Sequence, residues 1–359
     1  MGEGRNIFSA VDGPLPHGGA IDAMRDAYPD AREPWIDLST GISPFSYPMR
    51  ALDSRLWSSL PQSLDEDLLL DAAANRYGCH DRGMVVAAPG TQAIIQVLPR
   101  MFVGARVAIV SPTYGEHAAS WHRCGFDVFG SQNIDDAVSE TPDVVVVVNP
   151  NNPTGHVYTG DELRAAANTL ATRRASLVVD EAFVDLCEPG ISLVPTLPDN
   201  AIVLRSFGKT FGLAGVRLGF AISTAKFSTR LRQELGPWAV SGPAIDIGRR
   251  ALLDDDWFDT HRVRLRAQSL RLQNLLLGAG FRIEGATDLF VLGDIGSAQD
   301  VRERLAGAGV HVRHFADRPT WLRFGLPGAE SAWRRLEDAL FHRRANASSC
   351  THDVPGTAQ

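Results

Sequence analysis

Five consecutive valines, residues 144–148, are followed by the sequence NPNNPTG, and they constrain the fold more than any other part of the chain. A strand with one face in water alternates apolar and polar residues, whereas an unalternating β-branched run is typical of a strand covered on both faces. Further apolar runs of this kind end at polar or turn-forming residues, namely MVVAAPG, RVAIVSPTYG, SLVVDEAF, AIVLRSFGK and RLGFAIS. Helical segments such as TGDELRAAANTLATRR lie between several of them. The pattern predicts an α/β fold with a mostly parallel sheet.

The 359 residues are enough for about two domains. Residues 1–45 are rich in Gly and Pro and predict an N-terminal arm that enters a short helix, and residues 46–244 hold the sheet pattern. Residues 245–344 begin with a long polar-faced helix and predict a smaller α+β domain. The last residues, 345–359, have too little apolar content to pack and predict a disordered tail.

The helix predicted from SLDEDLLLDAAANRYG shows both of its end signals in the sequence. Ser63 is the expected N-cap, with Glu66 three residues later completing a capping box, and Gly78 is the expected stop.

The bulk composition excludes several classes of partner. The net charge of -7 argues against nucleic acid or an anionic membrane as the main partner, because both require a basic surface. No apolar run approaches the roughly 18 residues of a membrane span, and the first residues show no secretory signal. The four cysteines, at 79, 124, 187 and 350, are far apart and predict free thiols. We therefore expect a cytoplasmic protein without a metal site.

The segment SFGKTFGLAGVRLGF, residues 206–220, indicates covalent chemistry at Lys209. A lysine held among small residues near a pocket can lose its proton and form a Schiff base with a carbonyl. Ser206 lies three residues before it and Arg217 eight after it, and a hydroxyl with a guanidinium suits a phosphate group. A lone lysine here would usually be a solvated loop residue, but the combination favours a functional one.

The strand SLVVD ends in Asp180, which could be a metal ligand, a helix N-cap or the partner of a ring nitrogen. A metal would need further carboxylates or histidines at convergent spacing, and only Glu181 and Asp185 are near. The sequence therefore favours the last two readings.

Three other strand ends carry candidate binding residues. Gly90, Thr91 and Gln92 stand at the start of an apolar helix, where backbone N–H groups form a phosphate seat or an ordinary cap. Tyr114 could stack on a flat ring or belong to the core. Asn152 precedes a proline, which favours an extended backbone and lets its amide face a polar ring substituent.

Together these residues describe a planar aldehyde that carries a phosphate and a basic ring nitrogen, which is pyridoxal 5'-phosphate (PLP). We expect the 90–92 turn, Ser206 and Arg217 to bind the phosphate, and Lys209 to bind the aldehyde. Asp180 would then contact the ring nitrogen, Asn152 the ring hydroxyl and Tyr114 the face of the ring.

With these motifs in place, the sequence resembles the fold-type I PLP-dependent enzymes, the aspartate aminotransferase superfamily, from about residue 17 to 345. NPNNPTG, DEAF, SxxK and the following arginine match that family, and WLRFGLP resembles its segment with the substrate-binding arginine, here Arg323. The resemblance implies a large domain with a seven-stranded sheet, a smaller domain that includes the N-terminal arm as a cover of the active site, and a homodimer.

Within the superfamily, HGG at 17–19, PWIDLSTGISP and GPWAVSGPA resemble the L-threonine-O-3-phosphate decarboxylases of cobalamin biosynthesis. Departures from the aminotransferase pattern agree with this branch: Phe183 replaces a tyrosine that bonds the ring oxygen, Leu60 replaces a tyrosine that reaches the partner's phosphate, and Ser43 replaces an asparagine.

The implied reaction is decarboxylation of a small phosphorylated amino acid to (R)-1-aminopropan-2-yl phosphate and CO2, with Lys209 and Asp180 as catalytic residues. His17, Gly18 and Gly19 are the candidates for the substrate phosphate, and Arg323 with Asn152 for its carboxylate or phosphate, with Arg313 as a competitor.

The main alternative is an aminotransferase such as histidinol-phosphate aminotransferase. A transcription regulator with this fold would need a basic N-terminal DNA-binding region, and the first 45 residues are too short and not basic.

Overall fold

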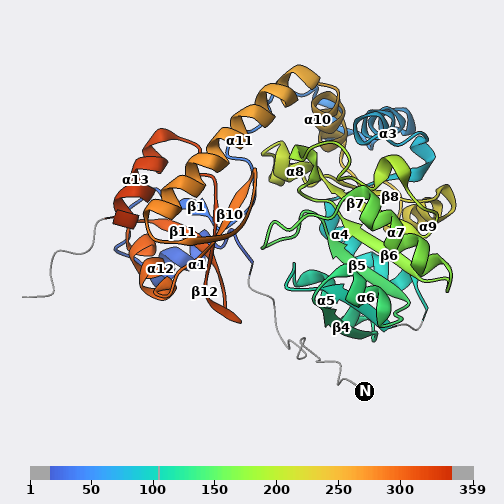
Figure 1. The fold of residues 1–359 in the computed structure, drawn as a ribbon. Helices are drawn as coiled ribbons and strands as arrows, with labels where there is room; N and C mark the ends of the chain where they lie inside the picture. The colour runs from blue at the N-terminus through green and yellow to red at the C-terminus, as the bar shows by residue number, and fades with distance from the viewer. Residues whose placement is uncertain (1–16, 104–105, 342–359) are drawn as a thin grey trace, which may run out of the picture.

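A computed structural model of the chain describes residues 17–103 and 106–341, which form two lobes with a sheet each (Figure 1). The larger sheet has seven strands in the order β2-β8-β7-β6-β5-β3-β4. All neighbours are parallel except β8, which runs antiparallel to β2 and β7. The strands are β2 (Val85–Ala88), β3 (Arg106–Val110), β4 (Asp127–Ser131), β5 (Val144–Val148), β6 (Ser176–Asp180), β7 (Ala201–Ser206) and β8 (Gly219–Ile222). The expected mostly parallel α/β sheet is confirmed.

The valine run is explained by two hydrophobic cores, one on each face of this sheet. Val145 and Val147 belong to one core, and Val144 and Val146 belong to the other. All five valines of β5 are at most 3% exposed. Each fully buried valine contributes about 1.5 kcal/mol or more relative to an exposed one, so the run stabilises both faces of the sheet at once.

Helices cover both faces of the sheet. The core that contains Val145 includes residues of α3 (Ser63–Tyr77), α6 (Ile134–Ser139), α7 (Gly160–Ala171) and α10 (Gly242–Leu252). The opposite core includes residues of α4 (Thr91–Val97), α5 (Glu116–Arg123) and α9 (Ala225–Leu235). Two short helices, α2 (Arg55–Ser58) and α8 (Phe207–Thr210), complete this lobe.

The start of α3 differs from the prediction, because Ser63 is its first helical residue and Gln62 is its N-cap. Gln62 has an extended backbone, and its carbonyl accepts bonds from the N–H groups of Asp65 and Glu66 at 3.0 and 3.2 Å. The predicted Ser63 capping box is therefore wrong. The predicted stop at Gly78 is confirmed, since this residue has the left-handed conformation (φ 74°) that glycine adopts most readily.

The smaller sheet has five strands in the order β1-β11-β12-β10-β9. Its strands are β1 (Ile36–Leu38), β9 (Arg282–Thr287), β10 (Phe290–Asp294), β11 (Val310–Phe315) and β12 (Arg318–Gly325). The helices of this lobe are α1 (Ile21–Ala27), α12 (Ala298–Gly307) and α13 (Glu330–Phe341). The N-terminal strand β1 pairs in parallel with β11, so the start of the described chain lies in the same lobe as its end.

The long helix α11 (Asp255–Gly278) runs from the larger lobe to the smaller one (Figure 1). Phe258 and His261 are buried near its start, and Leu272 and Leu276 are buried near its end. Ser269 donates a hydrogen bond to the carbonyl of Thr287 in β9 (2.8 Å), which ties the second half of the helix to the smaller sheet.

The sequence predicts free cysteines and no membrane span. Cys79, Cys124 and Cys187 are free thiols, while Cys350 and the predicted tail lie outside the described residues. Across residues 17–103 and 106–341, no helix combines the length and the apolar character that crossing a membrane requires.

Candidate active site

A cavity of about 510 Å³ lies where the ends of β5, β6 and β7 meet β12 and the N-terminal segment. In parallel sheets the carboxyl ends of the strands are the usual place for a ligand. Twelve of the thirteen predicted site residues line this cavity, namely His17, Gly18, Gly90, Thr91, Gln92, Tyr114, Asn152, Asp180, Ser206, Lys209, Arg217 and Arg323. Gly19 does not line it, because its N–H is turned to Ser39 Oγ and donates to it at 2.8 Å.

Lys209 stands on α8, a single turn that follows β7 directly. Its Nζ lies 5.2 Å from the ring centroid of Phe183. The pKa of Lys209 is lowered to about 8, chiefly by burial and also by the charges of Arg323 and Arg217, while Asp180 acts in the opposite direction. An amine with a pKa this close to neutrality can both attack a carbonyl and carry a proton.

Asp180 ends β6 and is 3% exposed, and two groups contact its carboxylate. Oδ1 accepts the N–H of Ala182 at 3.1 Å, and Oδ2 lies 3.0 Å from Nε2 of His117. His117 is itself 1% exposed and stands on the first turn of α5. A buried carboxylate needs such partners, and together they fix the direction in which it can face a ligand.

The 90–92 turn provides a backbone cradle. Gly90 is the N-cap of α4 and has φ 85°, and a Cβ there would lie 2.7 Å from Nη2 of Arg217. A Cβ at Gly219 would lie 2.6 Å from the backbone nitrogen of Thr91. Both glycines therefore let the strand, the helix start and the Arg217 guanidinium approach one another, which leaves backbone N–H groups and a cation together, as a phosphate requires.

A chain of polar contacts links this turn to the N-terminal segment. Tyr114 donates its hydroxyl hydrogen to Oε1 of Gln92 at 3.0 Å, and Nε2 of Gln92 donates to Oε2 of Glu116 at 2.8 Å. Oε1 of the buried Glu116 lies 3.1 Å from Nε2 of His17. Burial raises the pKa of Tyr114 to about 12, with Glu116 as the second cause, so the hydroxyl keeps its proton and remains a donor.

Arg323, on β12 of the smaller sheet, also lines the cavity and is 7% exposed. Nη1 donates to Oδ1 of Asn152, and Nη2 donates to the carbonyl of Ser39 at 2.7 Å. Its Nε is buried and has no hydrogen-bond partner within the described part of the chain. The pKa of Arg323 is lowered to about 10, chiefly by burial and also by the charge of Arg313. The charges of Arg313 and Arg323 and the unpartnered Nε of Arg323 would be stabilised by an anionic ligand.

These residues fit PLP on three observations in one cavity: a glycine cradle with an arginine for a phosphate, a buried carboxylate, and a lysine with a lowered pKa. Residues 17–103 and 106–341 hold no group of three or more His, Cys, Asp or Glu side chains placed to bind a metal ion.

Comparison with known proteins decides the family. The sequence model of aminotransferase class I and II matches residues 47–338. The chain belongs to the aminotransferase class I and II family. Two proteins named threonine-phosphate decarboxylase are each 41% identical to it. The similarity covers 91% of this chain and 97% of the protein from Pseudomonas aeruginosa. It covers 92% of this chain and 98% of the protein from Sinorhizobium sp. Among solved structures, a histidinol-phosphate aminotransferase from Sinorhizobium meliloti in complex with pyridoxal-5'-phosphate has the same fold, with a TM-score of 0.77, 19% identity and coverage of 89% of this chain and 93% of that one.

Sequence reasoning missed several residues of this aminotransferase-family site. His117 escaped notice because it lies 63 positions from Asp180, although its place three residues after Tyr114 is a usable signal. Ser39, Thr40 and Gly41 also line the cavity. A Cβ at Gly41 would lie 2.9 Å from Cε1 of Phe183, so this glycine brings the N-terminal segment against the wall on which Lys209 rests.

Proposed function

We propose that this protein is a PLP-dependent decarboxylase that converts L-threonine O-3-phosphate into (R)-1-aminopropan-2-yl phosphate and CO2 in cobalamin biosynthesis. The observation that carries the proposal is 41% identity to two threonine-phosphate decarboxylases along more than nine-tenths of the chain. The site supports it independently, because its free donor and paired arginines suit a substrate with both a carboxylate and a phosphate.

We assign the cofactor to Gly90, Thr91, Gln92, Ser206 and Arg217 through its phosphate, with Tyr114 beside the ring and Asn152 at the ring hydroxyl. When bound, PLP supplies a protonated pyridine ring that takes up the electron pair of the bond that breaks at the substrate α-carbon.

Lys209 and Asp180 have distinct tasks in this reaction. Asp180, held by His117 and the N–H of Ala182, stabilises the proton on the pyridine nitrogen. Lys209 binds the cofactor's aldehyde in the resting protein. Its pKa of about 8 also allows its Nζ to return a proton to the α-carbon after CO2 has left.

The substrate is held from the side opposite Lys209. Arg323 offers its unpartnered Nε to the carboxylate, and its bond to Asn152 keeps the guanidinium plane fixed. Arg313 is electrostatically coupled to both Arg323 and Tyr114, and we assign it to the substrate phosphate together with His17 and the N–H of Gly18. The amide of Gly19 is committed to Ser39, so it supports the turn instead of donating to the substrate.

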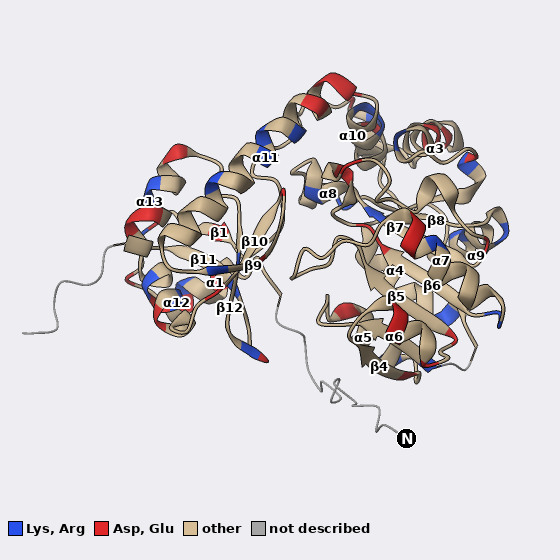
Figure 2. Cartoon of the chain, in the orientation of Figure 1, with Lys and Arg blue, Asp and Glu red and all other residues tan. Residues whose placement is uncertain are grey.

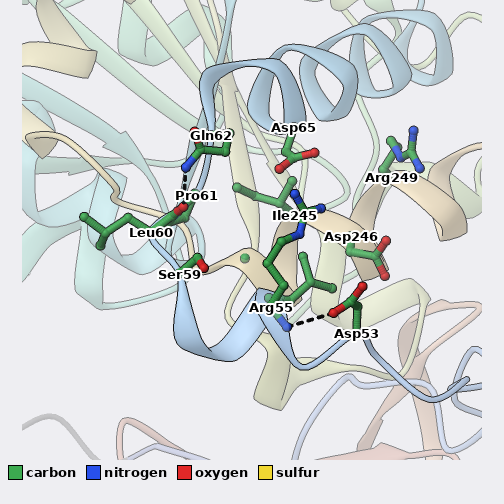
Figure 3. Close-up of a pocket in the computed structure, with 12 residues that line it drawn as sticks. Asp53, Arg55, Ser59, Leu60, Pro61, Gln62, Asp65, Ile245, Asp246 and Arg249 are labelled. Atoms are coloured by element: carbon green, nitrogen blue, oxygen red, sulfur yellow. Dashed lines mark hydrogen bonds between the residues drawn. The ribbon is translucent and has the colours of Figure 1, made fainter.

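We further propose that two copies of the chain form a homodimer. Trp57, Leu60 and Leu64 are 70%, 59% and 69% exposed, which is unusual for three large apolar side chains within eight positions. Leu60 also lines a hollow of about 490 Å³ between α2, the start of α3 and α10, where Arg55, Asp65 and Arg249 provide charges at the rim (Figure 3). Sedimentation of the wild-type protein beside a Trp57→Asp, Leu64→Asp variant tests this: the variant should be monomeric.

The remaining surface supports a small-molecule enzyme. Acidic and basic residues are interspersed on helices of both lobes, for example on α12 and α13, which suits neither a nucleic acid nor an anionic membrane (Figure 2). The described cysteines are free thiols, in keeping with a reducing cytoplasm as the working compartment.

The deciding experiment incubates the purified holoenzyme with L-threonine O-3-phosphate and measures CO2 and aminopropanol phosphate, with Lys209→Ala as the inactive control. Equimolar CO2 and amine, with no 2-oxo acid, support the decarboxylase. An aminotransferase would instead lose its visible absorbance on addition of an amino donor alone and release a 2-oxo acid. That result would overturn the proposal in favour of a transaminase.

A further inference from the structure

His261 lies at the junction between the long helix α11 and the turn that carries Lys209. It is 4% exposed and stands in the second turn of α11, in the half of the helix nearest α8 and α10 (Figure 1). It does not line the cavity, and its Nε2 contacts the turn that carries Lys209 at the carbonyl of Thr210.

Its Nε2 lies 2.9 Å from the carbonyl oxygen of Thr210 and 3.2 Å from Oγ of Ser43. A carbonyl only accepts hydrogen bonds, so Nε2 carries the proton and donates it. The N–H of Ser43 donates to the carbonyl of Lys209 at 2.9 Å. His261 and Ser43 therefore bind two consecutive carbonyls, at Thr210 and Lys209, and the Lys209 carbonyl also accepts the N–H of Gly212 at 3.3 Å.

Aromatic contacts fix the imidazole in this orientation. The ring is stacked on Trp257 at 4.2 Å between centroids with 19° between planes, and Phe45 meets it edge-on at 6.5 Å. Trp257 is also stacked on Phe211 at 5.6 Å, two residues after Lys209. Burial, the largest effect, lowers the pKa of His261, which agrees with a neutral ring that has one N–H to donate.

We propose that His261 is a positioning residue for the reaction proposed above: through its Nε2 bond to Thr210 and its contact with Ser43, it holds the α8 turn so that the Lys209 amine keeps its place beside the Phe183 ring. This inference rests on the proposed function, because that function defines the reaction. The contacts on which it is based involve only the turn that carries Lys209.

Three variants separate positioning from simple anchoring of the helix. His261→Leu removes the N–H and keeps an apolar side chain, and His261→Gln restores an N–H near the place of Nε2. Ser269→Ala is the matched control, because it removes one buried hydrogen bond from the same helix on the side of the smaller sheet. For each holoenzyme we would measure kcat and KM for CO2 release, the pH midpoint of the visible absorbance of the Lys209 Schiff base, and Tm.

We expect His261→Leu to lower kcat by about 10- to 100-fold, as a small displacement of a reacting group does, with a much smaller change in KM and a displaced absorbance midpoint. His261→Gln should recover most of kcat and the midpoint, and Ser269→Ala should change Tm only. The inference is overturned if His261→Leu behaves like Ser269→Ala, or if Gln fails to rescue. Absence of CO2 release from the wild type would refute the proposed function, while the absorbance midpoints would still decide the role of His261.

Discussion

Replacing Lys209 with methionine should stabilise the cofactor-free protein at neutral pH, although it abolishes activity. The folded protein lowers the pKa of this amine from 10.5 to about 8, so it tolerates the charged form poorly. This difference corresponds to at most about 3 kcal/mol of the free energy of unfolding. Methionine has a similar length and no charge to desolvate, so it removes that cost.

The pH dependence gives the sharper test. Between pH 8 and 10.5 the unfolded chain keeps a proton on Lys209 that the folded chain has lost, so this group makes the wild-type protein more stable as the pH rises. Lys209→Met lacks this gain. Its advantage over the wild type should therefore be largest below pH 8 and shrink toward pH 10.5.

The assay is the urea midpoint of cofactor-free wild type and variant, at equal protein concentration, from pH 6.5 to 10. Any packing gain from the methionine is independent of pH, so only the slope of the difference is interpreted. Lys226→Met is the control, because it removes the charge of an exposed lysine on α9. If the difference in urea midpoint between Lys209→Met and wild type stays constant with pH, as in the control, the pKa of Lys209 is not lowered in the folded protein. The amine would then not be ready to react near neutral pH.

Three further substitutions test the other walls of the site. Asp180→Asn should slow CO2 release by about a hundredfold or more while the visible absorbance of bound PLP remains, and near-normal turnover would remove Asp180 from its role. Arg323→Met should raise KM by roughly 10- to 100-fold, the loss of a charged hydrogen bond, and unaltered saturation kinetics would point to Arg313 instead. Phe183→Tyr places a hydroxyl beside Lys209 and should lower the pH at which the visible absorbance changes; an unchanged titration would show that the new hydroxyl does not reach the cofactor.

Much of the fold was predictable because strands covered on both faces have a strong local signal. The valines of β5 and the similar runs at β3, β6 and β7 are apolar whichever face they contact. Strand β4, DVFGS, was missed because it lies at the edge of the sheet and holds only two large apolar residues. The pairing of β1 with β11 was also beyond reach, since it joins segments more than 270 positions apart.

The cavity was predictable for a related reason. Parallel strands end at one edge, so residues that follow each apolar run are brought together whatever their separation in the chain. No such rule predicts the residues that position these site residues from behind. His117 and His261 approach the site from helices, and their contacts with Asp180 and Thr210 depend on how those helices pack. Helix packing is set by side-chain shape along the whole contact, and no short motif records it.

Lys209 and Asp180 cannot by themselves select decarboxylation, because transamination on the same cofactor would use the same amine and the same carboxylate. The selection must come from groups that decide which bond of the α-carbon stands perpendicular to the ring. We propose that in this chain those groups are Arg323, which donates hydrogen bonds to Asn152 and Ser39, and Phe183, which lies close to Gly41. In this proposal Arg323 would bind one end of the substrate from β12, in the lobe opposite the one that carries Lys209. On this proposal the reaction outcome depends on how the two lobes are set against each other, and α11 is the helix that runs from one lobe to the other (Figure 1).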